Sequence, residues 1–135
     1  LFLIFRKYYK IKELYLGIFV IALMVSEIPS FILSGYLLKR ISAHGTIALA
    51  HAIWVVVFLN FAYFTNHWYY LIGQALSGLA FPLMYNAVLN EAAVIGQSFS
   101  VGEGNLVTTM QSFVITVLFS VTAGIGGLIW GLLLD

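Results

Sequence analysis

The sequence has very little charge. Charged residues make up 8% of its 135 residues, whereas soluble domains carry about 25%. No Asp, Glu, Lys or Arg occurs from Ile41 to Asn90, and a second charge-free stretch runs from Gly104 to Leu134. A soluble fold of this size has too little interior to bury so much apolar surface. The composition therefore excludes a soluble domain and indicates a membrane-embedded protein, and the net charge of +1 gives no reason to expect a nucleic-acid partner.

Other features are also missing from the sequence. It has no cysteine, so the redox compartment cannot be inferred from disulfides. The three histidines show no metal-ligand spacing, and there is no nucleotide-binding loop, catalytic dyad or Ser-His arrangement. We therefore expect no metal, no cofactor and no enzymatic activity, and an ATP-driven pump is disfavoured.

Long apolar segments are the main feature that is present. A membrane-spanning helix needs about 20 apolar residues, and four segments meet this requirement: residues 14–38, 45–64, 68–95 and 106–134. They lack the alternating pattern of barrel strands, so each is expected to be a helix. The short connections predict antiparallel neighbours. The expected fold is an all-α, polytopic transmembrane helix bundle in one domain, with the lipid bilayer as its surroundings.

Both ends of the sequence are typical of a chain that has been cut within or just after a helix. Residue 1 is Leu, and residues 1–5 are typical of the last turn of a helix, while the last apolar segment stops at Asp135. We interpret the chain as a piece of a larger membrane protein, with missing helices of the same chain as packing partners. A count of Lys and Arg would place the basic cluster of residues 6–12 in the cytoplasm.

Glu27 lies near the middle of the first apolar segment. Ionisable residues at bilayer depth are costly and usually functional, and transporters bind solutes near the midplane. Because desolvation favours the protonated form of a carboxyl, we expect Glu27 to load and release a proton. The alternative is a neutral carboxyl that is hydrogen-bonded between helices for packing. His51 is a further candidate for the same proton path, although a lone intramembrane histidine more often bonds a neighbour.

Prolines and small polar residues accompany this carboxyl. Pro29 and Pro82 each predict a helix kink, because proline removes a backbone hydrogen bond. Ser34 lies seven residues after Glu27 on the same helix face, where it either lines a cavity or allows close helix contact. In the third segment, Gln74, Tyr85 and Asn86 lie at depths suited to solute contact or to interhelical hydrogen bonding.

The fourth segment carries glycines at helical spacing. Gly127 and Gly131 form a Gly-x-x-x-Gly pattern, and Gly124 lies one turn earlier. Small residues let helices approach closely, so we expect these three glycines to pack against another helix of the same chain.

Several motifs carry a resemblance to a known family. Ser26-Glu27-Ile28-Pro29, followed by Leu33-Ser34-Gly35 and the basic Lys39-Arg40, is similar to the eighth helix and following loop of a major facilitator superfamily transporter. The segment from Gln74 to Phe81 looks like the tenth helix, and Met110-Gln111 with the glycines up to Asp135 looks like the eleventh. The branch that it resembles contains phenylpropionate-permease-like and lactose-permease-like transporters.

This resemblance implies an arrangement of the chain. Residues 1–5 would end the seventh helix, the four segments would be helices eight to eleven, and the chain would form part of the C-terminal six-helix half of a major facilitator fold. Lys39 and Arg40 would then lie in the cytoplasm, opposite to the Lys and Arg count. In related transporters such a basic loop pairs with neighbouring helix ends, so Glu91 would join Lys39 and Arg40 in a cytoplasmic gate. The absence of an Asp before Arg40 departs from the family's fuller gate motif.

We therefore expect a secondary active transporter in the cell membrane. It would move a small organic solute by proton-coupled symport, with Glu27 as the proton-coupling residue and Ser34, Gln74, Tyr85 and Asn86 as solute contacts. The alternative is a transporter-like membrane protein that acts as a receptor or assembly partner. Sugars, aromatic acids and nucleosides all remain open as solutes.

Overall fold

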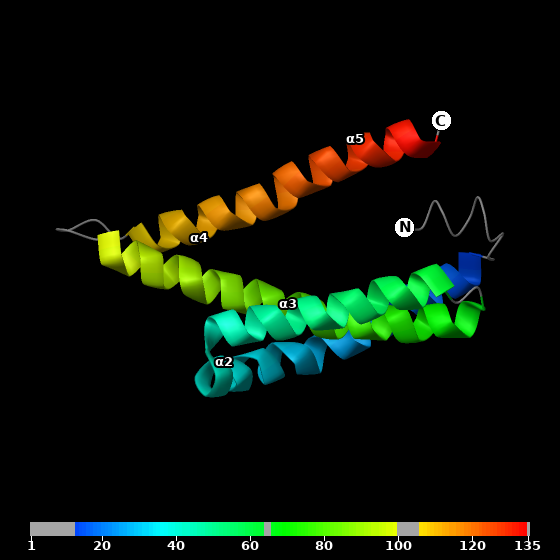
Figure 1. Ribbon diagram of the computed structural model, residues 1–135, viewed down its shortest axis with the longest axis horizontal. Coiled ribbons are helices and arrows are strands. Elements are labelled where there is room, and N and C mark those ends of the chain that lie inside the picture. Colours follow the sequence, from blue (N-terminus) through cyan, green and yellow to red (C-terminus); the bar gives the residue numbers. More distant parts are fainter. Residues whose placement is uncertain (1–12, 64–65, 100–105, 135) are drawn as a thin grey trace. The chain divides into compact units, whose positions relative to one another are not determined.

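The computed structural model describes residues 13–63, 66–99 and 106–134. Apart from a turn at Ser42 and a bend at Asn66, these residues are all helical, which confirms the all-α prediction. The elements are α2 (Glu13–Tyr63), α3 (His67–Phe99), α4 (Leu106–Thr116), the π-helix η1 (Val117–Val121) and α5 (Thr122–Leu134) (Figure 1). The expected helix end at residues 1–5 and the basic cluster at residues 6–12 lie outside the described residues.

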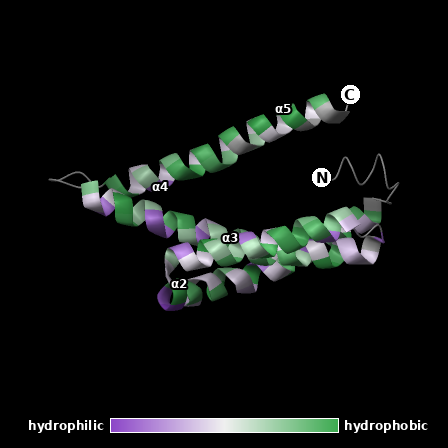
Figure 2. Ribbon diagram, in the orientation of Figure 1, coloured by the Kyte–Doolittle hydropathy of each residue, from purple (hydrophilic) through white to green (hydrophobic). Residues whose placement is uncertain are grey.

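The helices are apolar on nearly every face. Three of them, Leu14–Tyr63, Trp68–Phe99 and Leu106–Ile129, are long and apolar enough to cross a membrane. Hydrophobic residues occur along the whole length of each helix (Figure 2), and many large ones are exposed, including Leu14, Ile32 and Leu132. A helix that is hydrophobic all round is typical of a lipid environment. Helical structure follows, because backbone amides in lipid must be bonded within their own segment.

A sharp turn at Ser42 divides α2 into two arms, residues 13–41 and 43–63. Ser42 has φ 66° and ψ 169°, a conformation that residues other than glycine rarely adopt. Its hydroxyl oxygen accepts the Gly45 amide at 3.4 Å, and its carbonyl accepts the Thr46 hydroxyl at 2.8 Å. These bonds supply partners for the first turn of the second arm. The connection predicted over residues 39–44 is therefore shorter than expected, because helix continues up to Ile41 and resumes at Ala43.

Residues up to Ala87 form the first of two compact units. Its described part contains the two arms of α2, which run in opposite directions, and the first part of α3 (Figure 1). An aromatic cluster joins all three segments: the Tyr70 ring lies 6.4 Å from Phe19 of the first arm and 5.8 Å from Phe61 of the second, between centroids. Phe19 and Tyr70 are both 1% exposed and form the hydrophobic core of this unit.

Glycines set the spacing of α3 against both arms of α2. A Cβ atom on Gly73 would overlap the Phe61 ring and lie 2.9 Å from Asn60 Oδ1, both on the second arm. A Cβ atom on Gly78 would overlap the Ser26 hydroxyl and the Leu23 carbonyl oxygen on the first arm. At these two glycines α3 therefore approaches its neighbours more closely than a larger residue would allow.

The second unit contains residues 88–135. Within it, Gly96 of α3 lies against the backbone of Val107, where an added Cβ would be 2.7 Å from the Val107 Cα. Gln111 Nε2 donates to the Leu89 carbonyl at 3.4 Å. The predicted span of residues 106–134 is helical up to Leu134, but its turns widen to a π-helix at Val117–Val121.

The glycines of α5 have open space beside them. No described atom lies within 4 Å of a Cβ atom built on Gly124, Gly127 or Gly131. Within the second unit no described side chain packs on these glycines, so their predicted packing role stays a prediction.

Candidate functional site

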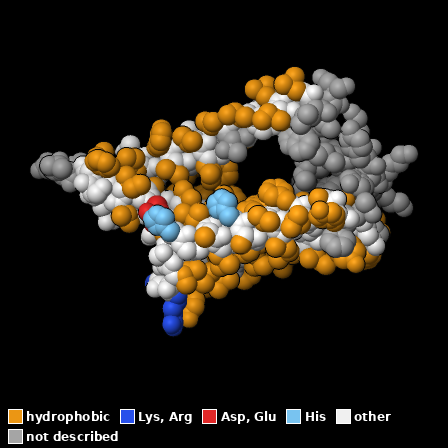
Figure 3. Space-filling model, in the orientation of Figure 1, with side chains coloured by type: hydrophobic (Ala, Val, Ile, Leu, Met, Phe, Trp, Pro, Cys, Tyr) orange, Lys and Arg blue, Asp and Glu red, His pale blue; other side chains and the backbone are white. Residues whose placement is uncertain are grey.

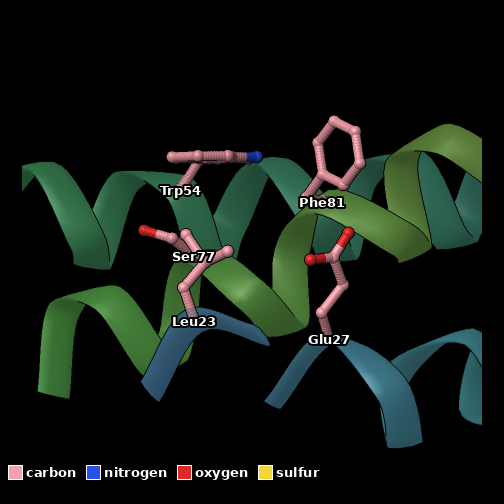
Figure 4. A pocket seen from close by; sticks show the side chains of 5 residues that line it. All are labelled: Leu23, Glu27, Trp54, Ser77 and Phe81. Atoms are coloured by element: carbon pink, nitrogen blue, oxygen red, sulfur yellow. The ribbon is translucent and has the colours of Figure 1, made fainter. Parts of the chain in front are cut away.

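The first unit contains a cavity of about 250 Å³. Five side chains line it: Leu23 and Glu27 from the first arm of α2, Trp54 from the second arm, and Ser77 and Phe81 from α3 (Figure 4). All three helical segments of the unit thus contribute to one site. The predicted proton-coupling residue is one of the five.

Glu27 lies at the midpoint of the first arm. It lies fourteen positions after Glu13 and fourteen positions before Ile41, so at 1.5 Å per residue it is about 21 Å from either end. Its side chain is partly buried, and its carboxyl group extends toward the ring of Phe81 (Figure 4). Among the described residues the carboxyl has no hydrogen-bond or ion-pair partner. The site thus holds a carboxyl that is available to a proton or to a ligand.

Serine hydroxyls around Glu27 bond to the helix backbone. Ser26 Oγ donates to the carbonyls of Ala22 and Leu23 at 2.9 and 2.8 Å, and Ser30 Oγ donates to the Ser26 carbonyl at 2.7 Å. These hydroxyls are therefore satisfied locally and do not bond to the carboxyl. Pro29 is exposed, and the helix passes through it without a non-helical residue. Pro82 is buried within α3, and the kinks expected at both prolines stay predictions.

Gly78 determines how closely the lining residues of α3 approach the first arm of α2. It lies between the lining residues Ser77 and Phe81, and a Cβ atom at this position would lie only 3.1 Å from the Leu23 carbonyl carbon. This close approach brings Ser77 and Phe81 next to Leu23 and Glu27. Ser77 is 6% exposed, and its hydroxyl donates to the Gly73 carbonyl at 2.9 Å.

Ser34 and Asn86, both predicted from the sequence as solute contacts, bond to each other. Asn86 Nδ2 donates to Ser34 Oγ, which in turn donates to the Phe31 carbonyl at 2.8 Å. Ser34 is fully buried. The pair lies about 10 Å along the first arm from Glu27, given seven intervening steps of 1.5 Å, and neither residue lines the cavity. The structure thus gives this pair an interhelical bond between α2 and α3.

Gln74 and Tyr85 lie one turn away from lining residues. Gln74 is 3% exposed and precedes Ser77 by three positions. The ring of Tyr85 stacks on Phe81, with centroids 5.8 Å apart and an interplanar angle of 19°. Neither residue lines the cavity itself, so their solute contact stays a prediction.

Sequence reasoning missed four of the lining residues: Leu23, Trp54, Ser77 and Phe81. Trp54 carries the clearest signal, because it lies deep in an apolar segment, whereas tryptophan in membrane proteins is enriched at the interfaces. Its indole stacks on Phe58, with centroids 5.6 Å apart. Leu23 lies one turn before Glu27 on the same helix face, a position that the 3.6-residue period indicates.

The predicted gate residues fall in different parts of the structure. Lys39 and Arg40 are exposed, and Figure 3 shows the Lys and Arg side chains where α2 turns. The Arg40 guanidinium carbon lies 5.2 Å from the centre of the Tyr36 ring, a cation–π contact within one helix. Glu91 belongs to the second unit, so the gate stays a prediction. His51 is exposed and its Nδ1 bonds to the Ile47 carbonyl at 2.9 Å; it does not line the cavity.

Comparison with known proteins gives one match. The model of the MFS_1 like family matches residues 1–135, which is the whole chain. No curated protein and no solved structure matches it.

Proposed function

The chain belongs to the MFS_1 like family, and from this premise we propose that it takes part in proton-coupled transport of a small organic solute. The family is one of major facilitator transporters, and three helices are long and apolar enough to span a membrane, so the chain is an integral membrane protein. We propose the coupling to protons, the class of the solute and the residues that bind the proton and the solute.

The observation that carries the proposal is the placement of Glu27. Its carboxyl lies at the middle of a membrane-length arm, reaches into a cavity built by three helical segments, and has no partner among the described residues. Intramembrane carboxyls that face cavities are typical of proton relays and solute pathways. A carboxyl held only for packing would instead bond to a neighbouring helix.

The mechanism assigns a role to each part of the cavity. Glu27 binds a proton when water reaches it from one side and releases the proton when the cavity opens to the other side. Trp54, Phe81 and Leu23 supply apolar surface for the body of the solute, which orients it against the carboxyl. Rocking of helices around this fixed site would couple the movement of the solute across the membrane to the movement of the proton. Direct evidence for the direction of coupling would come from the sign of proton flow.

The same proposal assigns the helical segments and the gate residues to parts of a permease. We assign residues 14–38, 45–64, 68–95 and 106–134 to helices eight to eleven of a permease in the cell membrane, on the motifs around Glu27 and Gln74. The gate of Lys39, Arg40 and Glu91 and the solute contacts of Gln74 and Tyr85 stay predictions within it.

Accumulation in vesicles tests the proposal. The full-length protein is reconstituted, a pH gradient is imposed, and uptake is measured across a panel of labelled sugars, aromatic acids, nucleosides and organic amines. We expect gradient-driven accumulation of at least one solute, which is lost in Glu27→Gln. The matched control is Glu13→Gln, which removes a carboxyl at the end of the same arm and is expected to leave accumulation unchanged. No accumulation of any solute by the wild-type protein would contradict the proposal.

A further inference from the structure

The polar groups that line the cavity mostly accept hydrogen bonds. The Ser77 hydroxyl already donates to the Gly73 carbonyl at 2.9 Å, so its oxygen presents lone pairs. An ionised Glu27 carboxylate is an acceptor only. The five lining side chains include no Lys, Arg or His, and their one remaining donor is the indole N–H of Trp54. The few polar groups in the lining of the cavity therefore have mainly acceptor character.

Two aromatic rings strengthen this character. Trp54 comes from the second arm of α2 and Phe81 from α3, and both lie on the same cavity as the Glu27 carboxyl (Figure 4). The face of an aromatic ring carries the negative part of its quadrupole. Tryptophan is the aromatic residue that attracts cations most strongly, and the attraction grows when the site is desolvated. Carboxylate and ring faces in one site therefore favour the same ligand charge.

We propose that the solute is a small organic cation with an apolar body, such as an alkylated or aromatic ammonium. Its positive charge would be held by Glu27 and by the faces of Trp54 and Phe81, with Leu23 against its apolar part. The volume of about 250 Å³ limits the ligand to a small one, since pockets for drug-sized ligands range from about 300 to 1,000 Å³. The inference rests on the proposed transport function, because it names the substrate class of the same site.

The proposal fixes the direction of proton coupling. A single carboxyl holds either a proton or the cation, so binding follows Glu27–COOH + R₄N⁺ → Glu27–COO⁻···R₄N⁺ + H⁺, in which the proton leaves as the cation arrives. The three segments around the cavity contribute no other Asp, Glu, Lys, Arg, His or Tyr to its lining. Protons and solute are therefore exchanged across the membrane, in place of the symport expected from the sequence.

Isosteric probes test the role of charge. Choline and 3,3-dimethylbutan-1-ol differ mainly by the replacement of a quaternary nitrogen with carbon, and their binding to the full-length protein in lipid nanodiscs is measured by calorimetry. We expect choline to bind at least about tenfold more tightly, a preference that corresponds to the upper range of cation–π and charge effects. The preference should fall in Glu27→Gln to the smaller part that the aromatic rings supply.

A second variant keeps the test decisive if Glu27→Gln does not fold. Trp54→Leu keeps apolar volume but removes the ring face, and it should weaken choline binding by roughly tenfold while the neutral isostere is affected less. Trp68→Leu is the matched control, because Trp68 is exposed and does not line the cavity. Equal affinity of the wild type for both probes, no binding of either, or a choline preference of wild-type size in Glu27→Gln would overturn the proposal.

The two assays separate the two claims. Gradient-driven accumulation of a neutral solute together with no choline preference would overturn the cation proposal and leave the transport function standing. Choline preference without any proton-coupled accumulation would contradict the transport function and support the cation site.

Discussion

Gly78 controls how closely α3 approaches the first arm of α2. Because a methyl group there would overlap Ser26 and Leu23, Gly78→Ala is expected to destabilise the first unit by about 1–3 kcal/mol, the usual cost of overpacking. Gly35→Ala is the matched control, since it lies on the same arm with no described atom within 4 Å. It should be neutral or stabilising by up to about 1 kcal/mol. The free energy of unfolding of each variant is measured in a mild detergent by adding increasing amounts of a denaturing detergent. Equal changes for Gly78→Ala and Gly35→Ala would contradict the close approach of α3 at Gly78.

The bond between Ser34 and Asn86 gives a second prediction for single residues. Ser34→Ala, Asn86→Ala and the double variant form a cycle, because Asn86 Nδ2 donates to Ser34 Oγ. We expect a coupling free energy of about 0.6–2 kcal/mol, as measured for interhelical hydrogen bonds in membrane proteins. A cycle between Ser34 and Thr116, which donates to the Ser112 carbonyl within its own helix, should show no coupling. Additive changes in the free energy of unfolding for Ser34→Ala and Asn86→Ala would contradict a hydrogen bond between the two side chains.

Among the elements, α2 shows most clearly what the sequence could and could not predict. Its two apolar segments and the turn between Lys39 and His44 follow from hydropathy, because a straight helix of 51 residues would be about 77 Å long and exceed the bilayer. The placement of the turn on Ser42 alone does not follow, since nothing in the composition marks a serine for positive φ. Rotation of each helix is equally hidden, because its apolar residues lie on every face.

Because the sequence does not reveal the rotation of each helix, it predicts only some of the residues around the cavity. Glu27 could be identified because a carboxyl is conspicuous in an apolar segment. Ser34 and Asn86 were recognised as polar candidates, but only the packed helices show that they bond to each other. Leu23, Trp54 and Ser77 could not be assigned to a cavity without knowing which helix faces meet, and Gly78 determines that meeting through contacts far apart in the sequence.

The turn of α2 yields a prediction with opposite signs at two positions. At Ser42, where φ is 66°, Gly adopts the backbone conformation without strain and is also an acceptable helix cap, whereas Ala retains the strain and loses the cap. Ser42→Gly should therefore be more stable than Ser42→Ala by about 1–3 kcal/mol. At Ala48, exposed in the second arm, Ala48→Gly should instead cost about 1 kcal/mol. Thermal unfolding in detergent measures the four proteins, and a Ser42→Ala variant at least as stable as Ser42→Gly would contradict the strained turn.

At the scale of the whole molecule, the described helices expose many large apolar side chains, and one carboxyl, that of Glu27, lies on the cavity of the first unit. Hydrophobic side chains cover most of the described surface in view (Figure 3), as lipid contact requires. Membership of the MFS_1 like family and three helices of membrane-spanning length agree with this surface. A carboxyl in such surroundings is costly, and the proposed proton-coupling role would account for its position beside a cavity.

The apolar exterior predicts how the protein fractionates. Membranes from cells that express it, washed at high pH and high salt, should retain the protein in the pellet, because its attachment is hydrophobic and does not depend on ionic contacts. Release into the wash would contradict an integral membrane protein. A detergent that dissolves the bilayer should release it, which serves as the control.

Proton movement on addition of solute tests the central claim most directly. Vesicles that contain the full-length protein are held without a gradient, a solute that accumulates is added, and the pH of a lightly buffered medium is followed for the wild type, Glu27→Gln and Glu13→Gln. The account predicts a pH change for the wild type and Glu13→Gln, and none for Glu27→Gln with its fold retained by circular dichroism. A pH change of wild-type size in Glu27→Gln would contradict the assignment of the transported proton to Glu27.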